Sequence, residues 1–515
     1  MRTPKNLKIA ITRTFRSVLL IIIILFGSGC VRDLAELNVN PDQPLTTNPN
    51  SLFRYVLQQG AGNYNSDVNL EQWGLMNWTM YMATRGGVEP GREYDIPSGK
   101  DVYWREQYTN TLSNAQEIVN MADQDPQLSN MKAAAQILQV YIFQIITDLW
   151  GAIPYSKALQ GISDLNLSPA YDSQRDAYLG MIQKLHTAIN AFDDTKPFFE
   201  PSADLIYRAD MNKWIAFGNS LLLRLATRIN KVEPGIYSDI VNQLSNQPMI
   251  SHNSESAIFP FNSVVKNHLW ETMSRNESTN QNNPSKFFVD LTTSRNDPRV
   301  KIYFEKAPLS FLPFIPNYKG VPNLLPNNNE AWSNYNLNAT IGVSGEWGDI
   351  CQIGSWFLHN NTPGVFMSYS EVCFLQAEAA LNGLWSTSAD ELLARGVRAN
   401  MEFYNRHATD QQVITELEIS SYIQNLPSAD LEEIITQKWL SFAYEQGYEA
   451  YAEYRRTGFP VLKDFVGNPI DRSVFPLRMP YPNSEVTLNR NNYNDALLLQ
   501  GADIAITKLW WMGEN

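Results

Sequence analysis

Cysteine and histidine are scarce in this chain, which has 3 Cys and 5 His among 515 residues. So few cysteines exclude a scaffold held together by disulfides. The sequence also contains no Cys-x-x-Cys, His-Glu-x-x-His, Gly-x-Ser-x-Gly or phosphate-binding glycine loop. These are the motifs of zinc sites, serine nucleophiles and nucleotide sites. We therefore expect no metal, no cofactor and no catalytic residue of these kinds, although a pair of glycosidase carboxylates has no sequence motif and stays open.

Positive charge is in deficit as well. The chain has 40 Lys and Arg against 53 Asp and Glu, a net charge of −13. The first 29 residues hold five basic and no acidic residues, so the remainder carries −18. An acidic body repels phosphate backbones, which excludes nucleic acid as a partner. With 44% hydrophobic and 18% charged residues, the chain can bury a large core.

No apolar run is long enough for a membrane span. The longest candidate, Val18–Phe26, would extend about 13 Å as a helix, less than half of a ~30 Å hydrocarbon core. It follows basic residues and precedes small ones, which is typical of a signal peptide over residues 1–29. Cys30 indicates a lipidation site, with Gly27 where a bacterial lipobox usually has Leu. An ordinary secretory signal with an incidental Cys30 is the alternative.

Residues 30–50 are rich in Pro and Asn and predict a lipidated tether in front of a single body, residues 51–515. Apolar residues at helical spacing predict helices, which we place at 101–122, 130–149, 174–193, 211–231, 369–383, 389–405 and 428–456. We divide the body into helical repeats (51–245), a loop-rich insertion of loops and short strands (246–365), helices (366–456) and an irregular C-terminal part (457–515). The pattern predicts a mainly α, tetratricopeptide-like superhelix with a loop-rich, irregular ligand-binding face.

Aromatic residues are plentiful, at 12% of the chain. Rings cover the apolar face of a sugar or peptide while amides and charges take its polar edge. Candidate ligand-binding residues are therefore Trp78, Tyr81, Arg85, Trp104, Trp270, Trp332 and Tyr335. Core packing is the competing interpretation, and it is favoured for Trp78, which sits at helical spacing with Trp73.

Three glutamates, Glu445, Glu449 and Glu453, recur every four residues near the end of the last long helix. Such a cluster could serve a lipid-anchored glycoside hydrolase, which needs two carboxylates in an aromatic cleft. A solvated helix face paired with Arg455 and Arg456 is the favoured interpretation. Whether Cys351 and Cys373 form a disulfide is left open by the sequence.

Several short motifs appear in a characteristic order after Cys30. They are Leu37–Pro41 (LNVNP), Asp148–Leu159 (DLWGAIPYSKAL), Arg295–Arg299 (RNDPR), Glu371–Ala379, Gln437–Trp439 with Glu449–Gly458, and Arg478, Tyr481, Pro482, Glu485, Asn489 and Asn492. In this order the chain resembles the SusD/RagB-like nutrient-binding outer-membrane lipoproteins of Bacteroidetes. The resemblance spans nearly the whole sequence.

The resemblance implies a cell-surface lipoprotein that captures oligosaccharide and delivers it to a SusC-like TonB-dependent outer-membrane transporter. It implies a lipid anchor in the outer membrane and no catalysis, while the motif residues themselves look structural. Capture of oligopeptides by the same machine and a purely structural surface protein remain alternatives.

Overall fold

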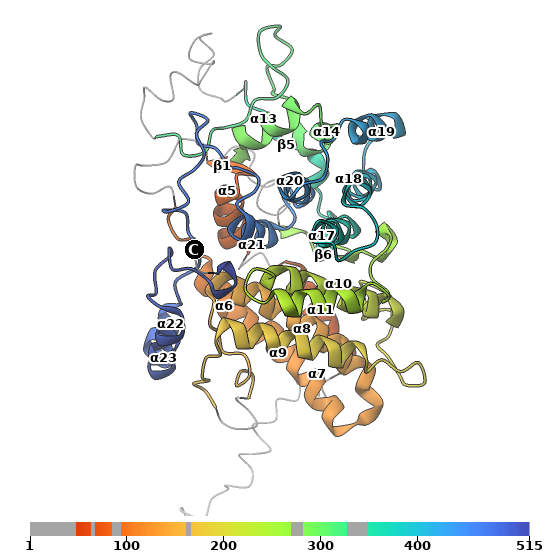
Figure 1. The fold of residues 1–515 in the computed structure, drawn as a ribbon, viewed down its shortest axis with the longest axis vertical. Helices are drawn as coiled ribbons and strands as arrows, with labels where there is room; N and C mark the ends of the chain where they lie inside the picture. Colours follow the sequence, from red (N-terminus) through yellow and green to blue (C-terminus); the bar gives the residue numbers. More distant parts are fainter. Residues whose placement is uncertain are drawn as a thin grey trace, which may run out of the picture. The chain divides into compact units, whose positions relative to one another are not determined.

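The computed structural model describes residues 48–62, 67–84, 94–160, 166–268, 282–326 and 348–513 (Figure 1). Apart from Asn48, all of these belong to one unit of the chain, Pro49–Asn515. The expected Cys30 anchor, the tether up to residue 47, and Arg85, Trp270, Trp332 and Tyr335 lie outside the described residues. Among the residues that are described, no helix is long and apolar enough to cross a membrane.

Helices dominate the unit, as expected for a mainly α protein. Those before residue 250 are α3 (Pro49–Ala61), η1 (Val68–Leu75), α5 (Met76–Trp78), α6 (Lys100–Glu106), η2 (Gln107–Leu112), α7 (Ser113–Gln124), η3 (Pro126–Leu128), α8 (Ser129–Trp150), α9 (Gln174–Ile189), α10 (Met211–Ile229) and α11 (Pro234–Leu244). Those after it are η4 (Asn253–Glu255), α13 (Lys286–Ser294), α14 (Val300–Tyr303), η5 (Ser355–Phe357), α17 (Tyr369–Leu381), α18 (Ala389–Asn405), α19 (Glu416–Gln424), α20 (Leu431–Ser441), α21 (Gly447–Thr457), α22 (Asn483–Leu488), α23 (Arg490–Gln500) and η6 (Trp510–Met512).

In the part of the chain that the structure describes, six short strands form three antiparallel pairs. They are β1 (Met82–Thr84) with β3 (Asn282–Pro284), β2 (Ala257–Phe259) with β6 (Gly364–Met367), and β4 (Phe304–Glu305) with β5 (Gln352–Ile353). Four of them lie within residues 246–365, where the sequence predicts loops and short strands, and β6 begins there and ends at Met367. Helix α13 was not expected there.

Helix α8 is the centre of the N-terminal helices. Most of its residues are apolar and it is buried on almost every side, with its largest contacts to α7 and α9. It ends where the sequence predicts, at Gly151, whose φ of +89° suits a residue without Cβ and whose N–H donates to Thr147 O at 2.7 Å. Gln500 Nε2, on α23, donates to Trp150 O at 2.8 Å. A helix distant in sequence thus provides a hydrogen bond to a carbonyl at the C-terminal end of α8.

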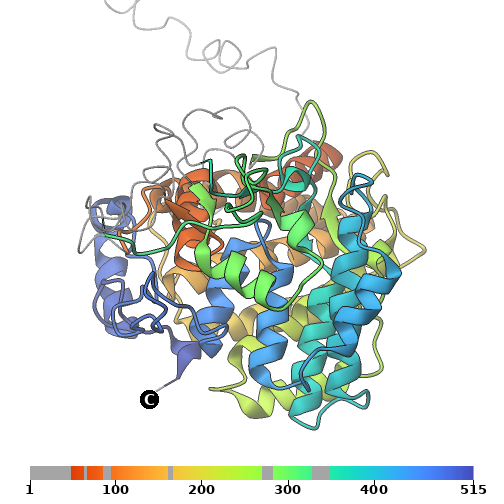
Figure 2. The ribbon, with the colours of Figure 1, turned by 90° about the horizontal axis from the view of Figure 1, so that it is seen from above.

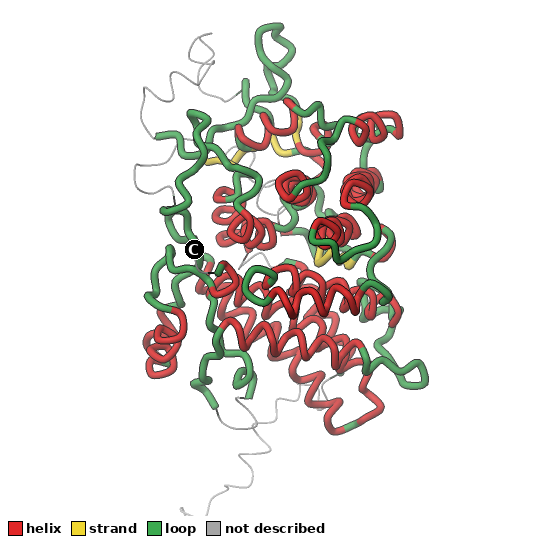
Figure 3. The backbone as a smooth tube through the Cα atoms, in the orientation of Figure 1, coloured by secondary structure: helices red, strands yellow, loops and turns green. Residues whose placement is uncertain are grey.

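Helices α17, α18 and α20 form the second group and are seen end-on where α8 to α11 run across the view (Figures 1 and 3). Viewed from above, α20 and α21 lie among these elements (Figure 2), and α21 contacts both α8 and η1. The two groups therefore meet along α8, α10 and α21.

Two expectations about the C-terminal part are wrong. The single helix over 428–456 is interrupted between α20 and α21, where Tyr444 takes a φ of +61°. The break lets Gly447 approach η1, and its N–H donates to Glu71 Oε1 at 2.7 Å. The part after residue 457, expected to be irregular, contains the helices α22 and α23. The apolar spacing of the sequence does not predict α23, because only Ala496 is buried on it.

Candidate functional site

A small platform of backbone lies where the loop-rich segments meet the helices. It consists of β1, β3, residues 319–323 and residues 349–351. Ser285 N donates to Tyr81 O at 3.1 Å, and Val321 N donates to Pro284 O at 2.9 Å. Ala83, Val321 and Ile350 pack together as a small buried cluster beneath it. Segments more than two hundred residues apart in sequence are thus fixed to one another.

Two residues that flank the platform, Met80 before β1 and Leu324 after residue 323, have unusual backbone geometry. Met80 has a φ of +61° and Leu324 a φ of +58°, values that side chains with a Cβ rarely adopt. The two are linked through Asn323, whose Nδ2 donates to Met82 O at 2.7 Å. Strained residues tend to gather at functional sites, since the surrounding structure must hold them in place. The platform is a candidate functional region because two such residues flank it and because of the stretches of sequence that it borders.

The platform also borders stretches of sequence that carry four of the predicted ligand-binding residues. Thr84 immediately precedes residues 85–93, Asn282 follows 269–281, and the stretch 327–347 is followed two residues later by Asp349. One described end of each stretch therefore lies at the platform. Arg85, Trp270, Trp332 and Tyr335 themselves lie outside the described residues, so their assignment stays a prediction.

Trp78 and Tyr81 are in the interior beneath the platform. Trp78 is 5% exposed and packs against Tyr451 and Phe475. Tyr81 is fully buried, stacks on Trp439 with ring centroids 4.2 Å apart, and donates its hydroxyl to Trp439 O at 2.6 Å. In this structure their ring faces are taken by other side chains. They support the platform from below, in line with the core interpretation that the helical spacing of Trp78 favours.

Trp104 lies elsewhere, in the wall of a groove with a volume of about 1080 Å³. The groove runs along α6, η2 and α7, with residues 154–159, residues 166–169 and α22 on its other side, and no platform residue lines it. Its volume suits a drug-sized or oligomeric ligand. Trp104 itself is only 5% exposed, because Trp150, Tyr108 and Tyr481 surround its ring. The structure thus separates Trp104 from the platform.

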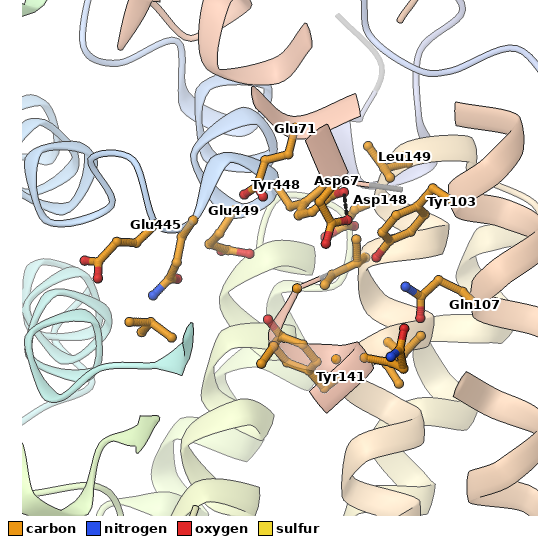
Figure 4. Close-up of a pocket in the computed structure, with 18 of the residues that line it drawn as sticks. Asp67, Glu71, Tyr103, Gln107, Tyr141, Asp148, Leu149, Glu445, Tyr448 and Glu449 are labelled. Carbon is orange, nitrogen blue, oxygen red and sulfur yellow. Dashed lines mark hydrogen bonds between the residues drawn. The ribbon is translucent and has the colours of Figure 1, made fainter. Parts of the chain in front are cut away.

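A second, much smaller cavity lies between α3, η1, α8 and α21 (Figure 4). Its volume is about 50 Å³, enough for ordered water and far too small for a sugar. Polar groups line it: Tyr448 donates its hydroxyl to Asp67 Oδ1 at 2.7 Å, and His268 Nε2 lies 3.6 Å from Glu71 Oε2. Burial acts to lower the pKa of His268, but Glu71 and Asp67 outweigh it and raise that pKa.

Beside this cavity, an ion-pair cluster joins the two groups of helices. Its members share deep burial and come from α8, α10, α17, α20 and α21: Asp148, Arg224, Arg228, Glu371, Glu378, Lys438, Glu449, Glu453 and Arg456. Arg224 binds Glu371 through two nitrogens, each 2.7 Å from an oxygen. Arg228 contacts Asp148, Glu449 and Glu453. In the cluster four cations neutralise most of the charge of five carboxylates, which lie almost out of reach of bulk water.

The expectation that Glu449 and Glu453 lie on a solvated helix face is therefore wrong. Both carboxylates are buried, at 7% and 4% exposure, because arginines from α10 and α21 neutralise them. Burial acts to raise the pKa of Glu453, but Arg456, Lys438 and Arg228 hold that pKa well below its usual value. The expected pairing with Arg456 is present, while Arg455 instead donates to Asp148 O and Leu477 O at 2.6 and 2.9 Å.

Glu445 lies outside that helix, in the turn before α21. Its Oε1 is enclosed and has no hydrogen-bond partner among the described residues. Burial raises the pKa of this carboxyl well above its usual value. The two remaining cysteines are also buried: Cys351 and Cys373 are free thiols, and burial raises the pKa of each to about 12. Among the described residues, no cluster of three His, Cys, Asp or Glu could hold a metal ion.

Comparisons with known proteins agree with this architecture. A structure described as a chitin-binding protein is similar over 91% of this chain and 100% of its own, with 25% identity and a TM-score of 0.78. A SusD homologue from Bacteroides uniformis is similar over 91% and 100%, with 23% identity and a TM-score of 0.73. A chitin-binding SusD homologue from Flavobacterium johnsoniae is similar over 91% and 99%, with 24% identity and a TM-score of 0.72. No curated protein sequence matches the chain.

The family model named SusD-like, described as starch-binding and associating with the outer membrane, matches residues 41–482. That range covers most of the chain and every described helix from α3 to α21. The expected tetratricopeptide-like helical fold is confirmed by the same matches. The resemblance found in the sequence is thereby confirmed, and the protein belongs to the SusD-like family.

Proposed function

We propose that this protein is a non-catalytic lipoprotein of the cell surface that captures oligosaccharides and delivers them to a SusC-like TonB-dependent transporter. The observation that carries the proposal is membership of a family described as starch-binding and associated with the outer membrane. The similar structure described as a chitin-binding protein, at 25% identity and full coverage, supports a glycan as the ligand.

The platform is the region that we assign to glycan capture. It holds the ends of the sequence stretches that carry Arg85, Trp270, Trp332 and Tyr335, and it does so with strained backbone on a rigid base. Binding residues commonly sit on loops that a stiff scaffold positions. Helix α20 contributes to that scaffold through Trp439, whose ring stacks on Tyr81.

The chemistry of the buried carboxylates supports a binding role over hydrolysis. A glycosidase needs one carboxyl to donate a proton and another to attack or to activate water, both open to the substrate. Glu449 and Glu453 are instead enclosed and held by arginines. The cavity of about 50 Å³ that Glu449 lines cannot admit a sugar ring.

Anchoring through Cys30 is the third part of the proposal. A thioether-linked lipid and further acyl chains would hold the body at the membrane, since each buried methylene contributes about 0.8 kcal/mol. Replacement of Cys30 by Ala should release the protein into the soluble fraction of cells. A Cys30→Ala protein that stays in the outer-membrane fraction would contradict the lipid anchor.

Glycan binding can be tested by calorimetric titration of the full chain, purified in detergent, with hexamers of chitin, starch and cellulose sugars and with a set of peptides. We expect binding to at least one sugar hexamer and no release of reducing ends. Variants Arg85→Ala and Asn120→Ala compare the platform with the groove beside α7; only the first should weaken binding. Binding of peptides alone, or cleavage of the sugar, would refute the proposal.

Delivery to a transporter can be tested by affinity purification from the native membrane. A TonB-dependent barrel should co-purify with the intact lipoprotein in stoichiometric amount. Absence of any such barrel under mild detergent would count against this part, whatever the glycan result.

A further inference from the structure

The loop Ala307–Asn317 presents two aromatic rings to solvent. Phe311 is 75% exposed and Phe314 is 58% exposed, among the most exposed aromatic side chains of the described residues. Exposed phenylalanine is costly, because burial of its ring would contribute about 1.5–3 kcal/mol. We call this segment the Phe loop.

The exposure of these rings is not the result of a loose backbone. Ala307 N donates to Asn317 O at 2.8 Å and closes the base of the loop. Two consecutive turns follow, with Leu312 N donating to Leu309 O and Ile315 N to Leu312 O, each at 3.0 Å. Ile315, at 5% exposure, fixes the loop to the body. The rings are therefore carried on an ordered support.

The Phe loop is joined directly to the platform. Leu309 N donates to Gly348 O at 2.7 Å, and Lys319, just past the loop, binds Asp349 at 2.6 Å. Gly320 then passes so close to the platform that a Cβ there would lie 2.4 Å from Ser285 O. The rings are thus held at the edge of the surface that the proposed function assigns to glycan capture.

The composition of the loop indicates what it recognises. No residue from Ala307 to Asn317 is charged, so the loop offers no ionic contact to a phosphate, a uronic acid or a charged peptide. It offers two flat apolar faces, with the hydroxyl of Ser310 and the amide of Asn317 nearby in sequence. Pyranose rings present C–H faces and neutral hydroxyl edges, which match this combination. Aromatic rings held in advance also lose little conformational entropy on binding.

We propose that Phe311 and Phe314 form an aromatic stacking site for a neutral oligosaccharide at the edge of the platform. This inference rests on the proposed function. It adds two residues that contact the glycan and specifies that the glycan is uncharged.

The test uses the full chain in detergent and the sugar hexamer that binds best in the titration above. Phe311→Ala/Phe314→Ala should weaken that binding about tenfold or more, as loss of two stacked rings predicts. Both side chains are exposed, so the variant should keep the circular dichroism and melting temperature of the unaltered protein. Phe311→Tyr/Phe314→Tyr retains the rings and should retain the affinity.

Two controls separate stacking from other effects. Leu417→Ala/Leu498→Ala removes two other strongly exposed apolar side chains and should leave the affinity unchanged. Lys306→Ala removes the exposed cation at the base of the Phe loop and should also leave it unchanged, since the ligand is neutral.

The inference is overturned if the double alanine variant binds the hexamer as well as the unaltered protein, or if Lys306→Ala weakens binding as much as loss of the rings. Failure of the proposed function is a separate result, in which the unaltered protein binds no sugar hexamer at all.

Discussion

Helices α8 and α21 are both buried, yet they are buried by different physics. On α8 most side chains are apolar and are buried by packing against α7 and α9, and Asp148 is its one member of the ion-pair cluster. On α21, Glu449, Glu453 and Arg455 are each less than 10% exposed, so its burial depends on charges that find partners on other helices. An apolar side chain can be buried against many different apolar neighbours. A buried charged side chain instead needs a partner of opposite charge or a hydrogen bond at a particular position.

The difference matters for how the platform is held. The break between α20 and α21 places Gly447 against Glu71 of η1, and η1 leads through α5 into β1. The ion-pair cluster therefore lies under the same elements that carry the candidate ligand surface. Four substitutions test this contrast between apolar and charged burial.

The largest effect is expected at Arg228. Its replacement by Met would leave Asp148, Glu449 and Glu453 without their common cation in a dry interior. We expect a loss of about 3–5 kcal/mol in the free energy of unfolding, as for other buried pairs that lose one partner. Urea denaturation followed by circular dichroism measures it. A loss below about 1 kcal/mol would show that the cluster contributes little.

Leu138→Ala on α8 should have the next largest effect. Leu138 is fully buried, and its truncation leaves a cavity in the N-terminal core. The expected loss is about 2–4 kcal/mol, and it should not vary with pH because no titratable group is removed. Denaturation at pH 5 and pH 8 checks both statements. If the loss in the free energy of unfolding changed with pH, apolar burial on α8 and charged burial on α21 would not be independent.

Glu445→Gln should stabilise the protein. Burial raises the pKa of Glu445, so ionisation is more costly in the folded chain than in the unfolded chain. Below the ordinary pKa both states hold the proton, and the variant should match the unaltered protein. As pH rises above that value the unaltered protein loses stability, and the variant should gain about 1 kcal/mol or more over it at pH 7.

Thermal melts from pH 4 to pH 8 follow this gain. Equal melting temperatures for the two proteins across that range would contradict the prediction, since the carboxyl would then ionise as readily inside the fold as outside it.

Arg175→Met should have the smallest effect. Arg175 Nε lies 2.6 Å from Glu233 Oε1, but its side chain is 49% exposed. Exposed ion pairs contribute about 0–1 kcal/mol, because water screens them. Measured in the same denaturation series as Arg228→Met, this variant shows how much burial increases the contribution of an ion pair to the free energy of unfolding. If both variants lost a similar free energy, the buried and the exposed ion pairs would not differ in this respect.

Some predictions from sequence were accurate because they depend on neighbours along the chain. The apolar spacing of residues 130–149 and the Gly151 stop predicted α8 to within one residue at each end. The prediction of a continuous helix over 428–456 was wrong because the sequence around Tyr444 did not indicate a turn there. That turn is held by Glu71, which is far away in sequence and accepts a hydrogen bond from Gly447. Phe311 and Phe314 escaped notice because exposure of a ring cannot be read from composition.

Sequence alone determined the family, the mainly α class and the position of the main helices, since short motifs and periodicity are local properties of a chain. Tertiary structure alone decided that Glu449 and Glu453 face arginines in the interior, that Trp78 and Tyr81 lie beneath the platform, and that Phe311 and Phe314 stand in solvent. The physical reason is that the cost of burying a charge or exposing a ring depends on which distant side chains surround it.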